Sequence, residues 1–211
     1  IVATPAWRAA DLVRPVVPKA AEALAGIPHV SNALVAMAFD ASRFPWQLRG
    51  YGYVVPRAEE REVMAMTWVS SKWPDRAPEG NVLVRAFIGR SGQEQVLVGD
   101  DASLVAIARH EIEDVLGVTG EPELTRVYRW ERGMPQYNLG HLQRVETIRT
   151  ECGRIPGFEI AGNMLRGVGI PDCIASGEQA AANVISTLGD RAIADRPARQ
   201  EAQSGAGAVT S

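Results

Sequence analysis

Short runs of β-forming residues, separated by clusters of turn residues, constrain the first half of this 211-residue chain more than any other feature. The runs cover residues 30–39, 51–55, 63–69 and 82–88, with turn clusters at 40–45, 56–61 and 74–80. In the fourth run, Val84 and Ala86 share one face of a strand, whereas Arg85 and Phe87 share the other. This spacing predicts an antiparallel meander.

Helical patterns flank these strands. Thr4 is the expected N-cap of a first helix, with Pro5 at its first position. Asp100 or Asp101 is the expected cap of a helix that ends at Leu116. Further helices are predicted over residues 20–25, 140–151 and 171–188, and further strands over 1–3, 124–130 and 158–161. The fold class is therefore α+β, a mixed and mainly antiparallel sheet with packed helices, followed by a closing strand–glycine loop–helix unit.

Composition excludes several classes of function. The net charge of −3 gives no basic face for nucleic acid. The two cysteines lie far apart, which favours a reducing, cytoplasmic compartment. The three histidines are scattered, so no metal site is expected. No run of about 20 apolar residues predicts a membrane span, and residues 189–211 have the composition of a disordered tail.

The segment over residues 161–177 is the most informative one about function. It is a strand, a loop flanked by Gly167 and Gly169, and a helix with Pro171 at its start. Glycines let the backbone approach a flat ligand closely, and unpaired N–H groups at a helix start stabilise negative charge. The spacing alone also fits a plain strand-to-helix turn, and by itself it favours that interpretation.

Several segments together resemble a known family. Residues 166–174, Arg-Gly-Val-Gly-Ile-Pro-Asp-Cys-Ile, are similar to the closing flavin motif of protoporphyrinogen and coproporphyrinogen oxidases, in the flavin amine oxidoreductase superfamily. Similar family segments follow the same order along the chain, at residues 1–5, 50–56, 67–74, 76–80, 129–130 and 134–141. The resemblance covers residues 1–188 and matches the C-terminal part of those oxidases.

The resemblance implies an FAD cofactor. Val168, Gly169 and Ile170 would contact the flavin ring through main-chain atoms, and Trp130 would lie beside it. For Trp130 a plain core aromatic is an equal alternative.

The resemblance also implies a porphyrinogen site over the sheet. Tyr51, Gly52, Val54, Phe87 and Met134 match positions that line it, with ordinary sheet packing as the alternative for each. The implied reaction, in haem biosynthesis, is hydride transfer from the macrocycle to the flavin, followed by reoxidation by O2. No catalytic acid–base pair or nucleophile is evident in the sequence, and in this reaction the cofactor carries the redox step.

The chain also departs from the family. The glycine-rich dinucleotide fingerprint and the central helical region of those oxidases are absent from these residues. We therefore expect a fragment that needs an N-terminal FAD-binding half, and that alone binds FAD weakly and turns over little or nothing. The expected parts are a strand end with linker helices over 1–29, the substrate-binding sheet over 30–130 and a closing FAD-contact segment over 131–188.

Other interpretations remain open at this point. The chain also fits another flavin amine oxidoreductase, such as an amine oxidase or carotenoid desaturase, or a non-catalytic tetrapyrrole-binding or interaction fragment. The sequence does not decide between protoporphyrinogen and coproporphyrinogen as the substrate. It also leaves open whether the protein forms a homodimer and whether it associates peripherally with the inner face of the cell membrane.

Overall fold

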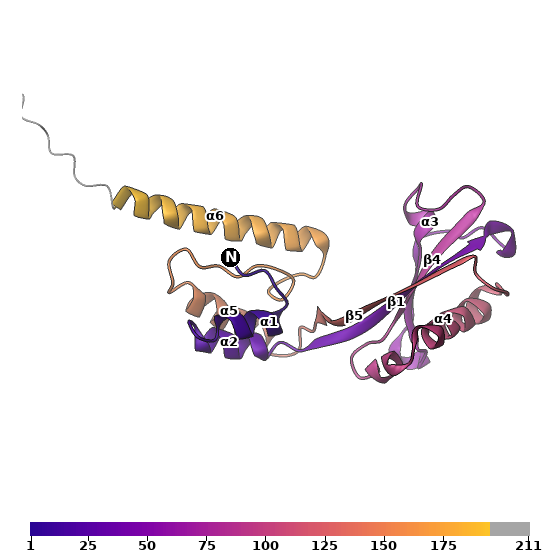
Figure 1. The fold of residues 1–211 in the computed structure, drawn as a ribbon, viewed down its shortest axis with the longest axis horizontal. Helices are drawn as coiled ribbons and strands as arrows, with labels where there is room; N and C mark the ends of the chain where they lie inside the picture. Colours follow the sequence, from indigo (N-terminus) through magenta and orange to yellow (C-terminus); the bar gives the residue numbers. More distant parts are fainter. Residues whose placement is uncertain (195–211) are drawn as a thin grey trace, which may run out of the picture. The chain divides into compact units, whose positions relative to one another are not determined.

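A computed structural model describes residues 1–194 of the chain (Figure 1). These residues form two compact units. Among the described residues, one unit consists of residues 1–26 and 140–194, and the other of Ile27–Leu139. The sheet unit is thus inserted, in sequence, between the two parts of a helical unit.

The sheet unit is built on five antiparallel strands. They are β1 (His29–Asp40), β2 (Gly52–Val54), β3 (Val63–Trp68), β4 (Asn81–Ile88) and β5 (Leu124–Pro135). Their order across the sheet is β2-β3-β4-β1-β5. The predicted meander is therefore correct only for β2 to β4. The strand β1 lies between β4 and β5, because the link of residues 41–51 carries the chain to the far edge of the sheet.

One face of the sheet packs on the helix α4 (Asp101–Leu116), as Figure 1 shows. Alternate residues of β1, β3 and β4 point into this core and meet Leu104, Ala108 and Ile112 of the helix. Fully buried side chains of this core include Val35, Met37, Phe39, Val63, Met66, Val84, Ile88, Leu104 and Ile112. Burial on this scale is the main source of stability for the unit.

A buried carboxylate on α4 fastens the β2 edge of the sheet. Glu111 is only 4% exposed. Its Oε1 accepts a hydrogen bond of 2.7 Å from the Tyr53 hydroxyl, and its Oε2 one of 3.0 Å from Arg61. Arg61 also pairs with Asp114. Burial, and then the hydrogen bond to Glu111, raise the pKa of Tyr53. A buried carboxylate is unusual, and the Tyr53 and Arg61 donors satisfy both oxygen atoms of Glu111.

Within residues 1–194, the helical unit contains four helices. Its helices are α1 (Ala6–Val13), α2 (Pro18–Ala25), α5 (His141–Cys152) and α6 (Ile170–Ala194). Ala6, Ala9 and Ala10 of α1 and Ala20 and Ala21 of α2 are buried, and their small side chains allow close approach of the helices. A parallel bridge joins Val2 to Ile160, with hydrogen bonds of 2.9 and 3.0 Å on its two sides.

One short helix and three 3-10 turns complete the sheet unit. The helix α3 (Val69–Lys72) follows β3, and the turns are η1 (Ala41–Arg43), η2 (Arg57–Glu59) and η3 (Glu94–Val98). The helix α3 ends the run that the sequence predicted as strand up to residue 69.

Several local predictions need correction. The N-cap of α1 is Pro5 and makes no side-chain hydrogen bond, so the predicted Thr4 cap is wrong. The predicted strands over 1–3 and 158–161 are reduced to the single Val2–Ile160 bridge. The helix predicted over 171–188 runs from Ile170 to Ala194, which includes the start of the predicted tail. The rest of that tail lies outside the described residues.

Candidate functional site

The face of the sheet opposite α4 is only partly covered. The pairing register aligns side chains on this face in rows across the strands. One row runs Val54, Ala65, Phe87, Leu34 and Tyr128 from β2 to β5. All five side chains are half-buried or exposed. We call this surface the open face.

The neighbouring row is more polar. It runs Gly52, Thr67, Arg85, Ala36 and Arg126 across the same five strands. An apolar row beside a row with two arginines suits a flat, mostly apolar ligand that carries negative groups at its rim.

The structure brings four of the predicted site residues to the open face. Gly52, Val54 and Phe87 lie in the two rows, and Trp130 lies opposite Asn32 at the β5 edge. Trp130 is 59% exposed, which excludes the alternative of a plain core aromatic in this structure. Phe87 is half-buried. Their predicted contacts with cofactor and substrate stay predictions.

Gly52 lies where two strands approach closely. Its φ is +135°, and a Cβ atom built there would be 2.0 Å from the carbonyl oxygen of Met66. Only glycine fits this position. The structure thus gives the glycine a local reason, the close pairing of β2 with β3.

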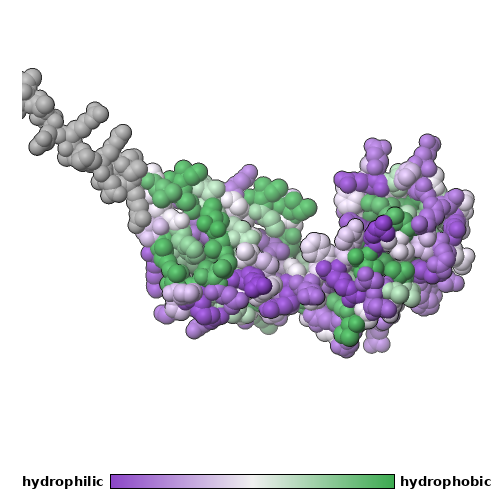
Figure 2. Space-filling view, viewed as in Figure 1, coloured by the Kyte–Doolittle hydropathy of each residue, from purple (hydrophilic) through white to green (hydrophobic). Residues whose placement is uncertain are grey.

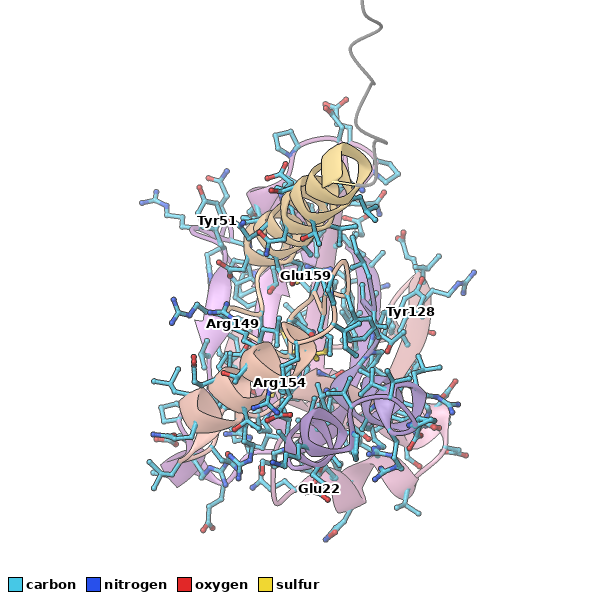
Figure 3. All side chains as sticks on the ribbon, turned by 90° about the vertical axis from the view of Figure 1, so that its left-hand side faces the viewer. Glu22, Tyr51, Tyr128, Arg149, Arg154 and Glu159 are labelled. Atoms are coloured by element: carbon cyan, nitrogen blue, oxygen red, sulfur yellow. The ribbon has the colours of Figure 1, made fainter. Side chains whose placement is uncertain are left out.

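Two of the predicted residues lie apart from the rows. Tyr51 precedes β2 and is exposed, and its carbonyl accepts a hydrogen bond from the Trp68 N–H. Tyr51 and Tyr128 mark the two edges of the sheet in Figure 3. Met134 lies beyond an irregularity in the β1–β5 pairing, where it faces Val30. Here β5 continues to Pro135, five residues past its predicted end.

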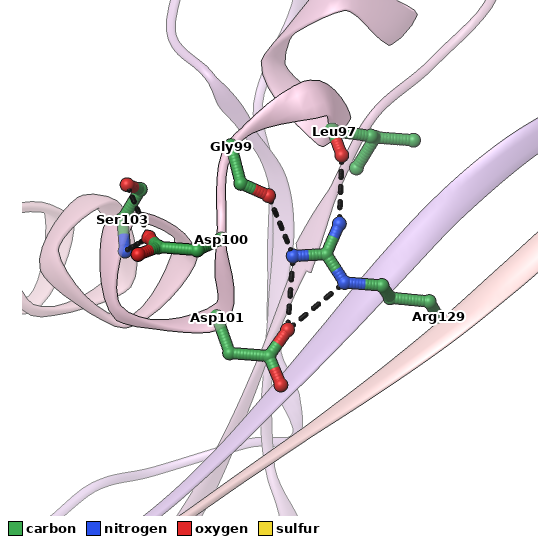
Figure 4. A network of polar contacts seen from close by, with 6 residues as sticks. All are labelled: Leu97, Gly99, Asp100, Asp101, Ser103 and Arg129. Atoms are coloured by element: carbon green, nitrogen blue, oxygen red, sulfur yellow. Dashed lines mark hydrogen bonds and ion pairs between the residues drawn. The ribbon is translucent and has the colours of Figure 1, made fainter.

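The residue before Trp130 fixes the position of β5. The Arg129 guanidinium bonds to Asp101 Oδ1 at 2.9 Å and to the carbonyl oxygens of Leu97 and Gly99, both at 2.7 Å (Figure 4). Asp101 lies in the first turn of α4, so one side chain ties β5, η3 and that helix together. Asp100 caps α4 by accepting from the Ser103 N–H at 2.8 Å, which settles the choice between the two aspartates.

In the helical unit, side chains from two helices hold the loop before α6. His141 Nε2 lies 3.0 Å from the Leu165 carbonyl oxygen. The Ser176 hydroxyl accepts a 3.0 Å hydrogen bond from the Gly162 N–H. Asp172 Oδ2 accepts from the Gly169 N–H at 3.1 Å, and it fills the space that a Cβ atom at Gly167 would need. The loop conformation therefore depends on glycine at 167.

The tip of this loop fits part of a flavin site. Val168 is 48% exposed and Ile170 is 78% exposed. Their N–H groups have no hydrogen-bond partner among residues 1–194. Apolar side chains beside free N–H donors suit an aromatic ring system with a polar edge. The Gly169 N–H, in contrast, is taken by Asp172, so only two of the three predicted donors are free.

A cavity of about 670 Å³ lies between α5 and α6 in the helical unit. Arg149 of α5 and Glu159 of the following loop, both labelled in Figure 3, belong to its lining. Cys152 also lines it, and burial raises the pKa of its thiol to about 11. Figure 2 shows hydrophobic side chains along α6, where Ile174, Ile185 and Leu188 are exposed.

Comparison with known proteins identifies the family. Residues 1–185 match the model of the flavin containing amine oxidoreductases, and the chain belongs to this family. It is 36% identical to a coproporphyrinogen III oxidase of Bacillus subtilis, over 78% of this chain and 37% of the relative. It is 38% identical to one of Propionibacterium freudenreichii, over 89% of this chain and 34% of the relative. The chain thus spans about a third to two fifths of these relatives.

More distant relatives and solved structures agree with this. A chloroplastic protoporphyrinogen oxidase of Oryza sativa is 27% identical over 89% of this chain and 37% of the relative. A crystal structure of an Exiguobacterium sp. 255-15 protein, assigned as a protoporphyrinogen oxidase, matches with a TM-score of 0.71 and 29% identity. That match covers 87% of this chain and 40% of the other. The α+β fold predicted from the sequence is confirmed.

Sequence reasoning missed several residues that build the site. Arg129 enters the sequence analysis only within the matched segment 129–130, and Glu111 does not enter it at all. His141 was counted only as a scattered histidine. In each case the partner lies more than 20 residues away, and single-sequence patterns carry no signal for such pairs.

Within residues 1–194, no group of three or more His, Cys, Asp or Glu side chains is placed to hold a metal ion. No helix in that part of the chain has the length and apolar character needed to cross a membrane.

Proposed function

We propose that these residues form the C-terminal part of an FAD-dependent porphyrinogen oxidase of haem synthesis, with O2 as the final electron acceptor. The observation that carries the proposal is the open face, where an apolar row of side chains crosses all five strands. Five strands span roughly 19 Å, at about 4.8 Å between neighbours. A flat tetrapyrrole fits on a surface of that width.

The relatives favour coproporphyrinogen III as the substrate. Three relatives named coproporphyrinogen III oxidase are 36–38% identical to this chain, whereas two named protoporphyrinogen oxidase are 26–27% identical. What those names state belongs to those proteins, and we extend it to this chain as a proposal.

In this proposal the chain binds and orients two flat rings. Phe87 and Val54 contact one face of the macrocycle, and the backbone carbonyl of Gly52 lies near it at the β2 edge. Val168 and Ile170 would support the flavin ring, and the bound flavin would supply the hydride-accepting chemistry, with O2 as the final electron acceptor. Positioning of this kind supplies much of the rate enhancement when the cofactor performs the bond-breaking step.

The test uses the natural full-length protein that contains these residues. Its visible spectrum is recorded before and after anaerobic addition of coproporphyrinogen III. We expect a flavin band that bleaches, returns with air and leaves porphyrin fluorescence. A yellow protein that never bleaches with any porphyrinogen, but bleaches with an amine, would replace this proposal with an amine oxidase.

A second test concerns residues 1–211 alone. We expect little or no FAD binding and no turnover, because these residues contain no glycine-rich phosphate-binding loop. Saturable micromolar binding of FAD, measured by fluorescence quenching of the flavin, would contradict the assignment of these residues as an incomplete flavin site.

A further inference from the structure

Arg85 is an arginine without an acidic partner on the open face. It lies on β4, opposite Thr67 of β3 and Ala36 of β1. Its Nε atom is buried and has no hydrogen-bond partner in the structure. Within residues 1–194, no hydrogen bond or ion pair of its guanidinium is present. A buried donor without a partner is costly, so a ligand that supplies an acceptor is favoured.

Aromatic rings hold the Arg85 side chain in place. Its guanidinium carbon lies 5.4 Å from the ring centroid of Trp73 and 5.8 Å from that of Phe87. Contact with aromatic rings holds the planar guanidinium group in place and leaves its outer N–H groups free to bind. Such a group is suited to a carboxylate, which it can bind through two parallel hydrogen bonds.

The charges on the open face favour an anionic ligand. Arg126 lies in the same row as Arg85, and no carboxylate occupies either of the two rows. The carboxylates nearest along the strands are Asp40, at the end of β1, and Glu123, just before β5. Asp40 accepts hydrogen bonds from Ser42, and Glu123 from Asn81. Asp40 is four residues from Ala36, roughly 13 Å along the strand.

We propose that Arg85 binds a propionate carboxylate of the porphyrinogen and thereby contributes to selection of coproporphyrinogen III. This inference rests on the proposed function. Coproporphyrinogen III carries four propionates and protoporphyrinogen IX two, so more orientations of the former place a carboxylate at Arg85. In this arrangement the macrocycle covers the apolar row, and the Arg85 guanidinium binds a carboxylate at the edge of the macrocycle.

The experiment compares three variants of the full-length protein with the wild type. Arg85→Gln removes the charge, and Arg85→Lys keeps it. Arg109→Leu is the matched control, because Arg109 lies on α4 and pairs with Glu121 at the surface. The dissociation constant of coproporphyrin III is measured by fluorescence titration. The KM and kcat are measured with coproporphyrinogen III.

We expect Arg85→Gln to weaken binding and raise KM by roughly tenfold or more, the effect of losing a hydrogen bond between charged groups. Arg85→Lys recovers part of this loss, and Arg109→Leu behaves as wild type. For the tetramethyl ester of coproporphyrin III, wild type and Arg85→Gln bind equally. A purely structural role of Arg85 would weaken the acid and the ester alike, and that result would overturn the inference.

The two proposals fail in different ways. If wild type oxidises coproporphyrinogen and neither Arg85 variant changes KM, the inference about Arg85 fails and the proposed function stands. If wild type binds coproporphyrin through Arg85 but never oxidises a porphyrinogen, the proposed function fails alone. If wild type binds no coproporphyrin, both fail.

Should Arg85→Gln not fold, an unchanged dissociation constant for Arg85→Lys at all salt concentrations overturns the inference.

Discussion

The hydrogen bond between Tyr53 and Glu111 provides a measurable link between the β2 edge and α4. In the variant Tyr53→Phe the ring remains packed edge-on against Trp68, with ring centroids 5.6 Å apart in the wild type, and only the hydroxyl is lost. Glu111 keeps Arg61 as a partner. Hydrogen bonds to charged groups contribute about 1.5–3 kcal/mol, and the remaining Arg61 contact places the expected loss near the lower limit.

This loss corresponds to a fall in Tm of roughly 3–6 °C for a protein of this size. The assay is thermal or urea unfolding followed by tryptophan fluorescence, to which Trp68 contributes. The matched control is Tyr128→Phe, because the Tyr128 hydroxyl has no hydrogen bond in the described chain and the residue is 52% exposed. We expect that control to change stability by less than about 0.5 kcal/mol.

The same pair predicts a pH dependence. Because the folded state raises the pKa of Tyr53 above its ordinary value of 10.0, the neutral hydroxyl is favoured in the folded protein. Its contribution is therefore complete below pH 10 and is lost as the pH rises above 10, where the unfolded chain ionises. The difference between wild type and Tyr53→Phe should be constant from pH 6 to 9 and shrink above 10. A difference that is near zero at pH 7, or that grows with pH, would refute the reasoning.

Three further predictions follow from contacts in the two units. Arg129→Ala removes hydrogen bonds to two carbonyl oxygens and an aspartate, so we expect the free energy of unfolding in urea to fall by about 1–3 kcal/mol. Arg126→Ala is the control and should lower it far less, because the Arg126 side chain bonds only to the adjacent carbonyl. Gly52→Ala places a Cβ atom against the neighbouring strand and should lower Tm much more than Gly50→Ala, which has open space; equal shifts would contradict the close approach. At pH 8, the thiol of Cys152 should react with a disulfide reagent more slowly than that of Cys173, because burial raises the pKa of Cys152 to about 11. Equal reaction rates of the two thiols would contradict this prediction.

Much of the fold follows from local patterns in the sequence. The alternation in residues 82–88 correctly predicted which side chains share a face of the strand, and in the structure Val84, Ala86 and Ile88 on one of these faces are buried. The long helix α4 was also predicted, with the correct end at Gly117, which adopts a left-handed conformation there. These features depend on residues within a few positions of each other, so one sequence carries their signal.

The order of strands could not be predicted in the same way. The strand β1 pairs with β4 and β5, which lie about 50 and 90 residues further along the chain, and no local pattern records such pairing. Its 12 residues make β1 one of the two longest strands, which suits a central position. The burial of Glu111 was missed for a related reason. Its charge predicts exposure, and only the distant Tyr53 and Arg61 make its burial favourable.

In the candidate site, too, residues marked by a local pattern were predicted and residues that depend on distant contacts were not. Motifs found the residues of the loop at 167–170 and the strand at 52–54, because these positions carry unusual glycines. Arg85 escaped notice although it was assigned to the correct face, since an arginine on a strand is ordinary until its surroundings are known. Arg85 stands out only in the structure, because its buried Nε atom has no hydrogen-bond partner and no carboxylate pairs with it among residues 1–194.

The first and last strands of the sheet unit are neighbours, and this makes the unit a self-contained insertion. The chain enters along β1 and returns along β5, and His29 pairs with Pro135 where the two strands meet their connections. Just outside that pair, the Gln136 N–H donates to the Pro28 carbonyl at 2.8 Å. Insertions are tolerated where their two ends lie close together. Strands can therefore be gained or lost at the β2 edge, and the open face widened or narrowed, while the points of entry and exit stay the same.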